Sequence, residues 1–446
     1  MTAPSLNTQE LRRVVIAAAV GNVIEWYDFY IFGSLAAILS VQFFSKADPV
    51  AAFLSTVALF SVGFLIRPLG AFVFGRVGDL IGRKYTFLIT LSGMGLSTAL
   101  IGVIPSYASI GLTAAFILFF LRLIQGLCLG GEYGGAITYV AEHVPDEKRG
   151  YYTGWLQTSP TLGIVVSLAV IIGVREYLGP EKWNAWGWRI PFLMSLLMVA
   201  IAIYIRLRLQ ETPIFQAIKA KGQTSKNPWR EAFLSQNIKY VLIASAVVLG
   251  EGVVWYSGQF WALYFLQQIR KPDTLSPAII TGIALLVAAP SLIFFGWLSD
   301  KIGRKPIILT GFALAAATYY PIYTALGKAA DPANTNWVLS VALVAIMVCY
   351  VGMVYGPIGA FLAEYFPARI RYTSVSVPYH IGNGWGGGLV PIITTSAYLH
   401  SNGNLGSALV YPIVVPIVAF IIGLLFMPET RKNKIWDQEM AGAPGR

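Results

Sequence analysis

GRVGDLIGRK, at residues 75–84, recurs 221 positions later as GWLSDKIGRK, at residues 296–305. Each copy lies between two long apolar segments, and six of the ten positions are identical. A second repeat, shifted by 222 positions, relates Ala141-Glu142, Pro145 and Arg149 to Ala363-Glu364, Pro367 and Arg371. Two matches at nearly one offset, about half the chain, predict two copies of one membrane bundle rather than a solenoid.

The composition favours a membrane protein over a soluble one. Of 446 residues, 56% are hydrophobic and only 12% are charged, about half the share of charged residues in a soluble protein. The net charge of +11 does not predict a nucleic-acid partner, because membrane proteins concentrate Lys and Arg on cytoplasmic loops. Cys128 and Cys349 both lie in apolar segments, so we expect no metal site, cofactor or disulfide framework.

Apolar runs of about 20 residues, enough to cross the hydrocarbon core, recur along the whole chain. They predict an all-α membrane protein with twelve transmembrane helices in two pseudo-symmetric six-helix bundles. The expected spans are 14–44, 50–74, 85–104, 110–140, 151–175, 187–207, 238–268, 277–299, 306–326, 335–364, 372–398 and 405–427.

The polar stretch 208–237 predicts a cytoplasmic linker between an N-terminal bundle at 1–207 and a C-terminal bundle at 238–430. Residues 431–446 form a short tail. Lys and Arg fall mostly on the even-numbered connections and the two tails. This bias predicts that both termini are cytoplasmic, in a multi-pass protein of a bacterial inner (plasma) membrane.

Several motifs resemble a known family. The two Gly-X-X-X-Asp-X-X-Gly-Arg-Lys loops and Arg122-Leu-Ile-Gln-Gly126 resemble signatures of the major facilitator superfamily. Residues 21–30 (GNVIEWYDFY), 67–70 (RPLG), 130–135 (GGEYGG) and 186–191 (WGWRIP) are similar to the metabolite:proton symporter family. The resemblance implies the major facilitator fold and permeases of the proline/betaine, α-ketoglutarate, shikimate and citrate type. It also supports an acid in span one and Arg122 in span four.

Ionisable residues inside spans are functional candidates. The rise of about 1.5 Å per residue places Asp28, Arg122 and Glu251 near mid-depth. We expect Asp28 to carry the coupling proton and to pair with Arg122 when ionised; a structural ion pair is the alternative. Glu25, one helical turn away, and Glu251 are further candidates for proton coupling.

Arg122 could also bind a substrate carboxylate, since its planar fork suits one. Glu251 could instead hold a substrate amine. Polar and aromatic side chains in spans one, four, five, seven, ten and eleven are candidates for substrate binding, although packing is an alternative for each. They are Tyr27, Gln125, Gln157, Trp255, Tyr256, Gln259, Tyr355, His380, Asn383 and Trp385.

Charged residues near the cytoplasmic face predict a gate. Asp79 and Asp300, with Arg83, Lys84, Arg304 and Lys305 after them, should meet the repeated pairs Glu142 with Arg149 and Glu364 with Arg371 through charge-assisted contacts. The alternative is that these charges only enforce topology. Rise-per-residue arithmetic also places Arg67 and Glu132 in this inner gate network.

Three function hypotheses follow. The first is a secondary active transporter that imports a small organic acid or zwitterion with protons by alternating access. Ser159-Pro160-Thr161 stands where an antiporter motif would lie, which favours symport. The second is a uniporter or exchanger of the same solutes, and the third is a polytopic receptor. No enzyme is predicted. The expected partners are the metabolite, protons and the lipid bilayer, with a functional monomer.

Overall fold

The computed structural model describes residues 8–81, 83–207, 238–271, 273, 275–367 and 371–435, and these residues form helices and loops without a β-strand. The first half contains α1 (Thr8–Ser34), α2 (Ala36–Phe43), α3 (Pro49–Leu65), α4 (Arg67–Ile81), α5 (Arg83–Ile101), α6 (Tyr107–Ile110), α7 (Leu112–Gly130), α8 (Tyr133–His143), η1 (Asp146–Lys148), α9 (Arg149–Ala185), η2 (Gly187–Arg189), α10 (Ile190–Leu193) and α11 (Ser195–Leu207).

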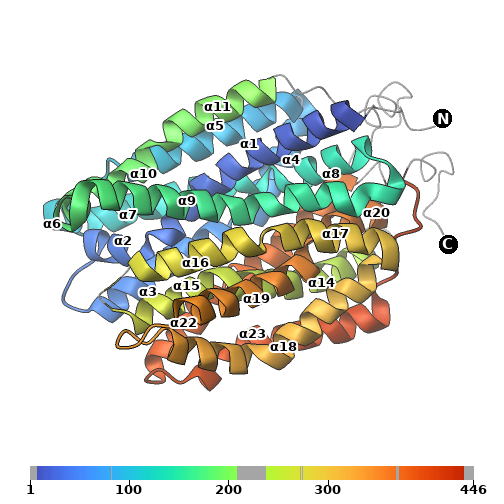
Figure 1. Cartoon of the computed structure of the whole chain (residues 1–446). Helices are drawn as coiled ribbons and strands as arrows, with labels where there is room; N and C mark the ends of the chain where they lie inside the picture. The colour runs from blue at the N-terminus through green and yellow to red at the C-terminus, as the bar shows by residue number, and fades with distance from the viewer. Residues whose placement is uncertain are drawn as a thin grey trace.

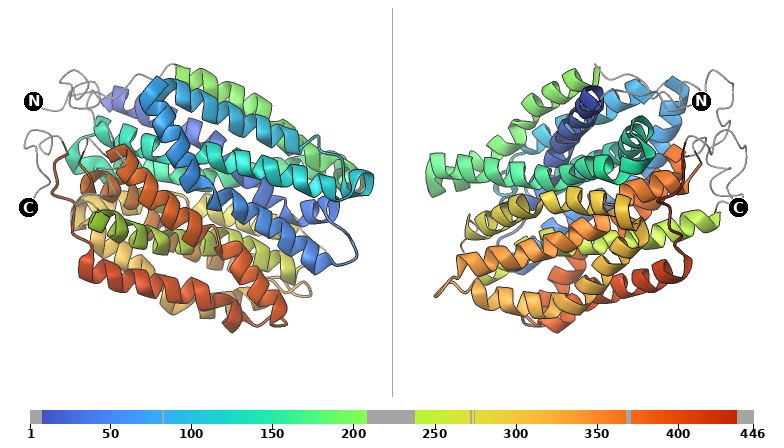
Figure 2. Two further views of the ribbon diagram at one scale, coloured as in Figure 1. Left: turned by 180° about the vertical axis from the view of Figure 1, so that it is seen from behind. Right: turned by 45° about the vertical axis from the view of Figure 1, so that its right-hand side comes forward.

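The second half contains α14 (Ile238–Tyr256), η3 (Ser257–Trp261), α15 (Ala262–Ile269), α16 (Leu275–Ala288), α17 (Pro290–Ile302), α18 (Arg304–Ala329), α19 (Trp337–Tyr355), α20 (Ile358–Tyr365), α21 (Arg371–Tyr379), η4 (His380–Gly387), α22 (Val390–His400) and α23 (Leu405–Phe426). In Figures 1 and 2, α5 and α11 lie at one side of the molecule and α18 and α23 at the other.

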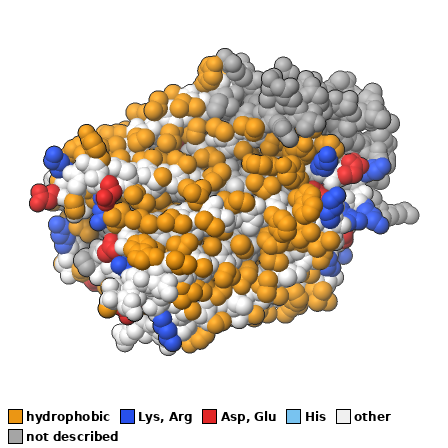
Figure 3. All heavy atoms as spheres, viewed as in Figure 1, with side chains coloured by type: hydrophobic (Ala, Val, Ile, Leu, Met, Phe, Trp, Pro, Cys, Tyr) orange, Lys and Arg blue, Asp and Glu red, His pale blue; other side chains and the backbone are white. Residues whose placement is uncertain are grey.

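These elements make twelve crossings, as the sequence predicts. Within the described residues, nine helices are long and apolar enough to cross a membrane, and α1 with α2, bent by 60°, is a tenth. The other two crossings are α5 and the α21–η4–α22 segment. Hydrophobic side chains cover the middle of the face seen in Figure 3, and charged ones gather at its two ends. The surface therefore suits a bilayer.

The start of α1 and the segment after α23 lie at the same end of the molecule (Figure 1, right), as an even number of crossings requires. The predicted linker at 208–237 and most of the tail at 431–446 lie outside the described residues. The domain boundaries therefore stay predictions.

The fifth crossing is longer than the expected span, 151–175. Helix α9 continues to Ala185, with a break at Gly179, whose φ is +76°. Glycine adopts this conformation readily, and Pro180 then starts a new helical turn, a position where its missing N–H costs nothing. The chain therefore leaves the span through a helical extension that composition alone did not predict.

The seventh and eleventh crossings contain wide π-helical turns, η3 and η4. Such turns leave some backbone carbonyls without their regular helical hydrogen bond. Inside a membrane, these carbonyls need another donor. At η3 two tyrosines supply it: the Tyr323 hydroxyl donates to Ser257 O at 2.5 Å, and Tyr319 donates to Val254 O at 3.0 Å. The irregular backbone is thus stabilised by side chains of α18.

Glycines bring the two halves into backbone contact where α9 meets α17. A Cβ added to Gly296 would lie 2.4 Å from Gly150 O, and one added to Gly150 would lie 2.4 Å from Gly296 O. Neither position tolerates a side chain while the helices keep this spacing. Gly296 is the first residue of the second copy of the repeated decapeptide.

Candidate functional site: a latch and an enclosed polar centre

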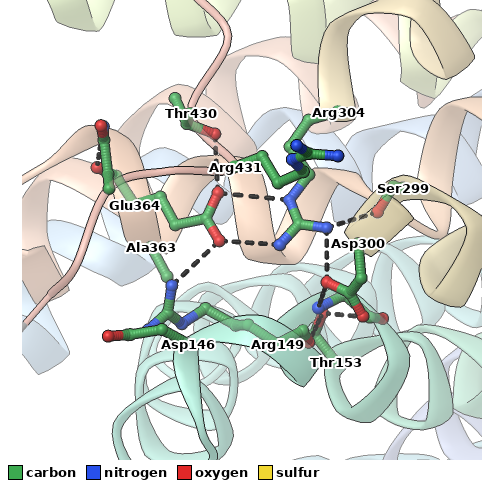
Figure 4. A network of polar contacts seen from close by, with 12 residues as sticks. Asp146, Arg149, Thr153, Ser299, Asp300, Arg304, Ala363, Glu364, Thr430 and Arg431 are labelled. Atoms are coloured by element: carbon green, nitrogen blue, oxygen red, sulfur yellow. Dashed lines mark hydrogen bonds and ion pairs between the residues drawn. The ribbon is translucent and has the colours of Figure 1, made fainter. Parts of the chain in front are cut away.

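An ion pair joins the two halves at the end of the molecule where α1 begins. Arg149 Nη1, at the start of α9, lies 2.9 Å from Glu364 Oε1 on α20, and both side chains are fully buried. Arg304 Nη2 contacts the same oxygen at 2.9 Å, and Thr430 donates to Glu364 Oε2 at 2.7 Å. Figure 4 shows Glu364 between these partners. One carboxylate therefore ties α9, α18 and the segment after α23 together.

A second ion pair repeats the first with the halves exchanged. Arg371 Nη1, at the start of α21, lies 3.0 Å from Glu142 Oε1 on α8. Glu142 corresponds to Glu364 in the repeat, and Arg371 corresponds to Arg149. Each half therefore gives one acid and one base to the interface.

Asp300, in the second copy of the decapeptide, completes the contact. Its carboxylate accepts hydrogen bonds from the backbone N–H groups of Gly150 and Tyr151, both at 2.8 Å, and from Arg304 Nη1 at 2.6 Å. Figure 4 shows Asp300 beside the start of α9. We call this set of side chains the latch: Glu142, Arg149, Asp300, Arg304, Glu364 and Arg371.

Not all predicted gate residues join the latch. Lys305 donates to Leu424 O at 2.9 Å within its own half. The side chains of Asp79, Arg83 and Lys84 lie outside the described part of the chain. The buried Glu132 accepts from Thr90 at 2.7 Å, in the first half.

Arg122 lies on α7 and is fully buried. Its nitrogens donate to Gln125 Oε1 at 2.7 Å, Phe60 O at 3.2 Å, Phe29 O at 3.4 Å and Leu59 O at 3.5 Å. Gln125 in turn donates to Thr98 Oγ1 at 2.7 Å. Arg122 therefore ties α1, α3 and α7 of the first half together.

The expected pairing of Asp28 with Arg122 is not formed in this conformation. Asp28 is fully buried, and neither carboxylate oxygen accepts a hydrogen bond of normal geometry from any described residue. The Ser195 hydroxyl lies beside it but donates to Gly95 O at 3.1 Å. The side chain thus lies towards α5 and α11, because helix rotation turns it away from the guanidinium.

Arg67 begins α4 and lies among aromatic rings rather than in the latch, which corrects its expected place. The centre of its guanidinium lies 4.1 Å from the ring centre of Phe64, 4.5 Å from Phe29 and 5.1 Å from Trp26. The side chain is fully buried, and none of its three nitrogens donates a hydrogen bond of normal geometry to the described chain. The Tyr256 hydroxyl lies close by and contacts Tyr30 OH at 3.1 Å.

Polar groups of the second half face this region. Asn383 Nδ2, in η4, lies 3.2 and 3.3 Å from the two carboxylate oxygens of the buried Glu251 on α14. Tyr256 and Tyr379 both lie near Glu251 and Arg67. An acid of the second half and a base of the first therefore lie near the same pair of tyrosines.

A hydrogen-bonded chain crosses between the halves next to Glu251. Gln157 Nε2 on α9 lies 3.0 Å from Tyr133 OH and donates to Tyr355 O at 3.2 Å. Tyr355 OH contacts Tyr379 OH at 3.1 Å. The neighbouring His380 is buried, with its ring centre 5.4 Å from that of Tyr379.

The remaining predicted lining residues divide into central and peripheral ones. Trp255 stacks on Tyr30 with ring centres 5.3 Å apart, and Gln259 is buried without a partner for either amide atom among the described residues. Tyr27 donates to Pro191 O at 2.6 Å and packs within the first half. Trp385 is 45% exposed and donates to Leu65 O at 3.0 Å, so it lies outside the enclosed centre.

Glu25 is fully buried in α1. Tyr30, Tyr133 and Tyr379 were missed by the sequence analysis. Tyr30 lies two residues after Asp28 and Tyr379 directly precedes His380. Their position next to ionisable residues in apolar spans could have identified them as site candidates.

An apolar helical surface, a buried polar centre and a contact between halves at one end define a multi-pass membrane transporter. The chain belongs to the sugar (and other) transporter family of the major facilitator superfamily; the family's sequence profile matches residues 14–227 and 216–440. This confirms the resemblance predicted from the motifs.

Relatives match over nearly the whole chain. It is 32% identical over 434 residues to the inner membrane metabolite transport protein YhjE of Escherichia coli (strain K12), covering 95% of each chain. It is 32% identical over 436 residues to the shikimate transporter of the same strain, covering 96% of this chain and 97% of that one. It is 33% identical over 438 residues to that strain's proline/betaine transporter, covering 96% and 85%.

Among solved structures, the proton:xylose symporter XylE aligns with a TM-score of 0.76 and 16% identity, covering 98% of this chain and 100% of that one. At this identity the likeness shows the shared fold alone.

Proposed function

We propose that this protein imports a small carboxylate-bearing or zwitterionic metabolite together with protons by alternating access. The main support for this proposal is the latch, whose ion pairs join the two halves at one end of the molecule. Beyond it lie buried charged residues: Asp28, Arg67, Arg122 and Glu251. Relatives named for proline, betaine and shikimate transport support a substrate that carries a carboxylate.

The latch supports alternating access because its ion pairs run between the halves. Access to the centre from that end requires Arg149 to leave Glu364 and Arg371 to leave Glu142. Breaking a buried pair exposes both charges to water, which offsets much of the lost attraction. The latch therefore stabilises the closed form, but by a free energy small enough for the protein to open.

Asp28 supports proton coupling. Keeping an ionised carboxylate in an apolar interior without donors costs several kcal/mol, and a bound proton removes the charge. When the bundle opens, water can solvate the carboxylate and take the proton. Glu25 and Glu251, which are also buried, could share this role.

We place the protein in a bacterial inner membrane as a monomer with both termini in the cytoplasm. The excess of Lys and Arg on one set of connections supports this orientation, and the latch then faces the cytoplasm.

The test is proton movement upon solute addition. Wild-type protein in liposomes without an imposed gradient receives proline, glycine betaine or shikimate, and external pH is recorded. Symport predicts alkalinisation with the transported solute. Uptake without a pH change would identify a uniporter or exchanger instead.

The matched variants are Asp28→Asn and Asp331→Asn, since Asp331 is an exposed loop acid. Asp28→Asn should abolish proton-driven accumulation and retain exchange of solute across the membrane. Asp331→Asn should behave as wild type. Normal accumulation in Asp28→Asn would remove Asp28 from the coupling step.

A further inference from the structure

We propose that Arg67, rather than Arg122, binds the substrate's carboxylate. The inference rests on the proposed function and adds to it the residue that recognises the anionic group.

The hydrogen-bonding groups of Arg67 carry the argument. A guanidinium presents several N–H donors in a rigid fork that matches a carboxylate. In this structure all three nitrogens of Arg67 are buried, and none has an acceptor of normal geometry in the described chain. Buried polar groups almost always have partners, so a fully buried guanidinium without one indicates a ligand-binding group.

Arg122 differs in this respect. Its side chain donates to Gln125 and to three backbone carbonyls of α1 and α3. A substrate carboxylate would have to displace those bonds and leave buried carbonyls without donors, at a cost for each one. Arg122 therefore holds the first half together, and Arg67 is the arginine whose donors are available.

The surroundings of Arg67 suit an anion. The rings of Trp26, Phe29 and Phe64 fix the guanidinium by cation–π contact while offering it no acceptor. Such a fixed donor fork loses little entropy when it binds. The hydroxyls of Tyr30, on α1, and Tyr256, on α14, are 3.1 Å apart and lie near Arg67, so each half brings a hydroxyl to this region.

This geometry also links binding to closure. Phe64 contacts Arg67 on one side and packs closely on the end of η4 on the other: a Cβ added to Gly388, the residue that follows η4, would lie 2.3 Å from Phe64 Cβ. A carboxylate held by Arg67 therefore lies beside the junction of the two halves, where it can favour the closed form.

The test begins with wild-type proteoliposomes offered a pooled set of carboxylate metabolites together with their amide counterparts, with uptake identified by mass spectrometry. Binding and uptake of the identified solute are then measured for Arg67→Gln, Arg67→Lys and, as a control, Arg175→Gln. Arg175 lies in α9 near the outer end of its crossing.

We expect a carboxylate to be taken up in preference to its amide. Arg67→Gln should weaken its binding by about tenfold to 100-fold, the effect of a lost charge-assisted hydrogen bond. It should also remove the preference over the amide, which a purely structural role would not do. Arg67→Lys should recover part of both, and Arg175→Gln should match wild type.

Other outcomes separate this inference from the proposed function. Uptake of a carboxylate with unchanged affinity and preference in Arg67→Gln would overturn the inference and leave the proposed function standing. Uptake of only an uncharged solute would overturn the inference and the carboxylate substrate class. No uptake by wild type, with binding also undetected, would count against both. If Arg67→Gln does not fold, Arg67→Lys decides the matter: weaker binding with a smaller preference for the carboxylate over its amide supports the inference, and binding and preference equal to wild type overturn it.

Discussion

Arg149 and Glu364 belong to different halves of the protein, and their fully buried side chains meet at 2.9 Å. Glu364 also accepts from Arg304 of its own half. The ion pair that Glu364 makes across the interface therefore depends on Arg149, because its loss leaves Glu364 with Arg304, a partner in the same half.

Arg149→Gln should shift the protein towards a form open at the latch. Removing one member of a buried ion pair costs about 3–5 kcal/mol, and this cost falls on the closed form. Spin labels at the exposed positions Lys148 and Lys301, with Cys128 and Cys349 replaced by Ala, should report longer distances by electron paramagnetic resonance. Arg149→Lys should shift the distances less; identical distributions in wild type and Arg149→Gln would remove the latch role.

Gly296→Ala should open the same end by a steric route. The added Cβ would lie 2.4 Å from Gly150 O, a distance that the backbone can relieve only by separating α9 from α17. The control is Gly173→Ala in α9, where nothing lies within 4 Å of the new Cβ and alanine favours the helix. With the same spin labels, Gly296→Ala should lengthen the distance and Gly173→Ala should not.

Tyr323→Phe should destabilise the seventh crossing. It removes the donor to Ser257 O in η3, and a buried carbonyl left unpaired costs about 1–3 kcal/mol. Tyr320→Phe is the control, because Tyr320 is 52% exposed. Thermal unfolding in detergent should show a lower midpoint for Tyr323→Phe only. Equal midpoints would mean that the π-helical turn does not need this tyrosine.

Arg67→Met should raise the stability of the ligand-free protein. The substitution loses three cation–π contacts, about 0.5–2 kcal/mol each. It also removes a buried charge without an acceptor of normal geometry among the described residues, a penalty of several kcal/mol. We expect the second effect to win and the unfolding midpoint to rise. Arg189→Met should lower it, since Arg189 donates to Gly102 O and Ile104 O at 2.9 and 2.6 Å. A lower midpoint for Arg67→Met would contradict this balance.

The sequence was sufficient to predict the twelve crossings, because the length of an apolar run states directly whether a helix can span a bilayer. It also brought Glu142, Arg149, Glu364 and Arg371 to one end of the molecule, since the repeat relates them in pairs. The pattern could not say that each acid would pair with the base of the other half.

Depth and rotation explain the misplaced residues. The predicted end of span two, near residue 74, placed Arg67 close to the cytoplasmic face. Helix α4 instead continues to Ile81, so Arg67 lies about 21 Å from the end of this helix. For Asp28, the helical rise predicts a depth in the membrane but carries no information about which neighbours the side chain meets. Only packing against α5 and α11 decides that it lies away from Arg122.

The exchanged pairs of the latch have one more consequence. A single six-helix half contains both an acid and a base of this set, so two separate copies of one half would satisfy both pairs across a two-fold axis, as in an isologous homodimer. The present chain is therefore equivalent to such a dimer joined into one polypeptide. Its two halves are free to diverge in the centre while the interface keeps the symmetry of its origin.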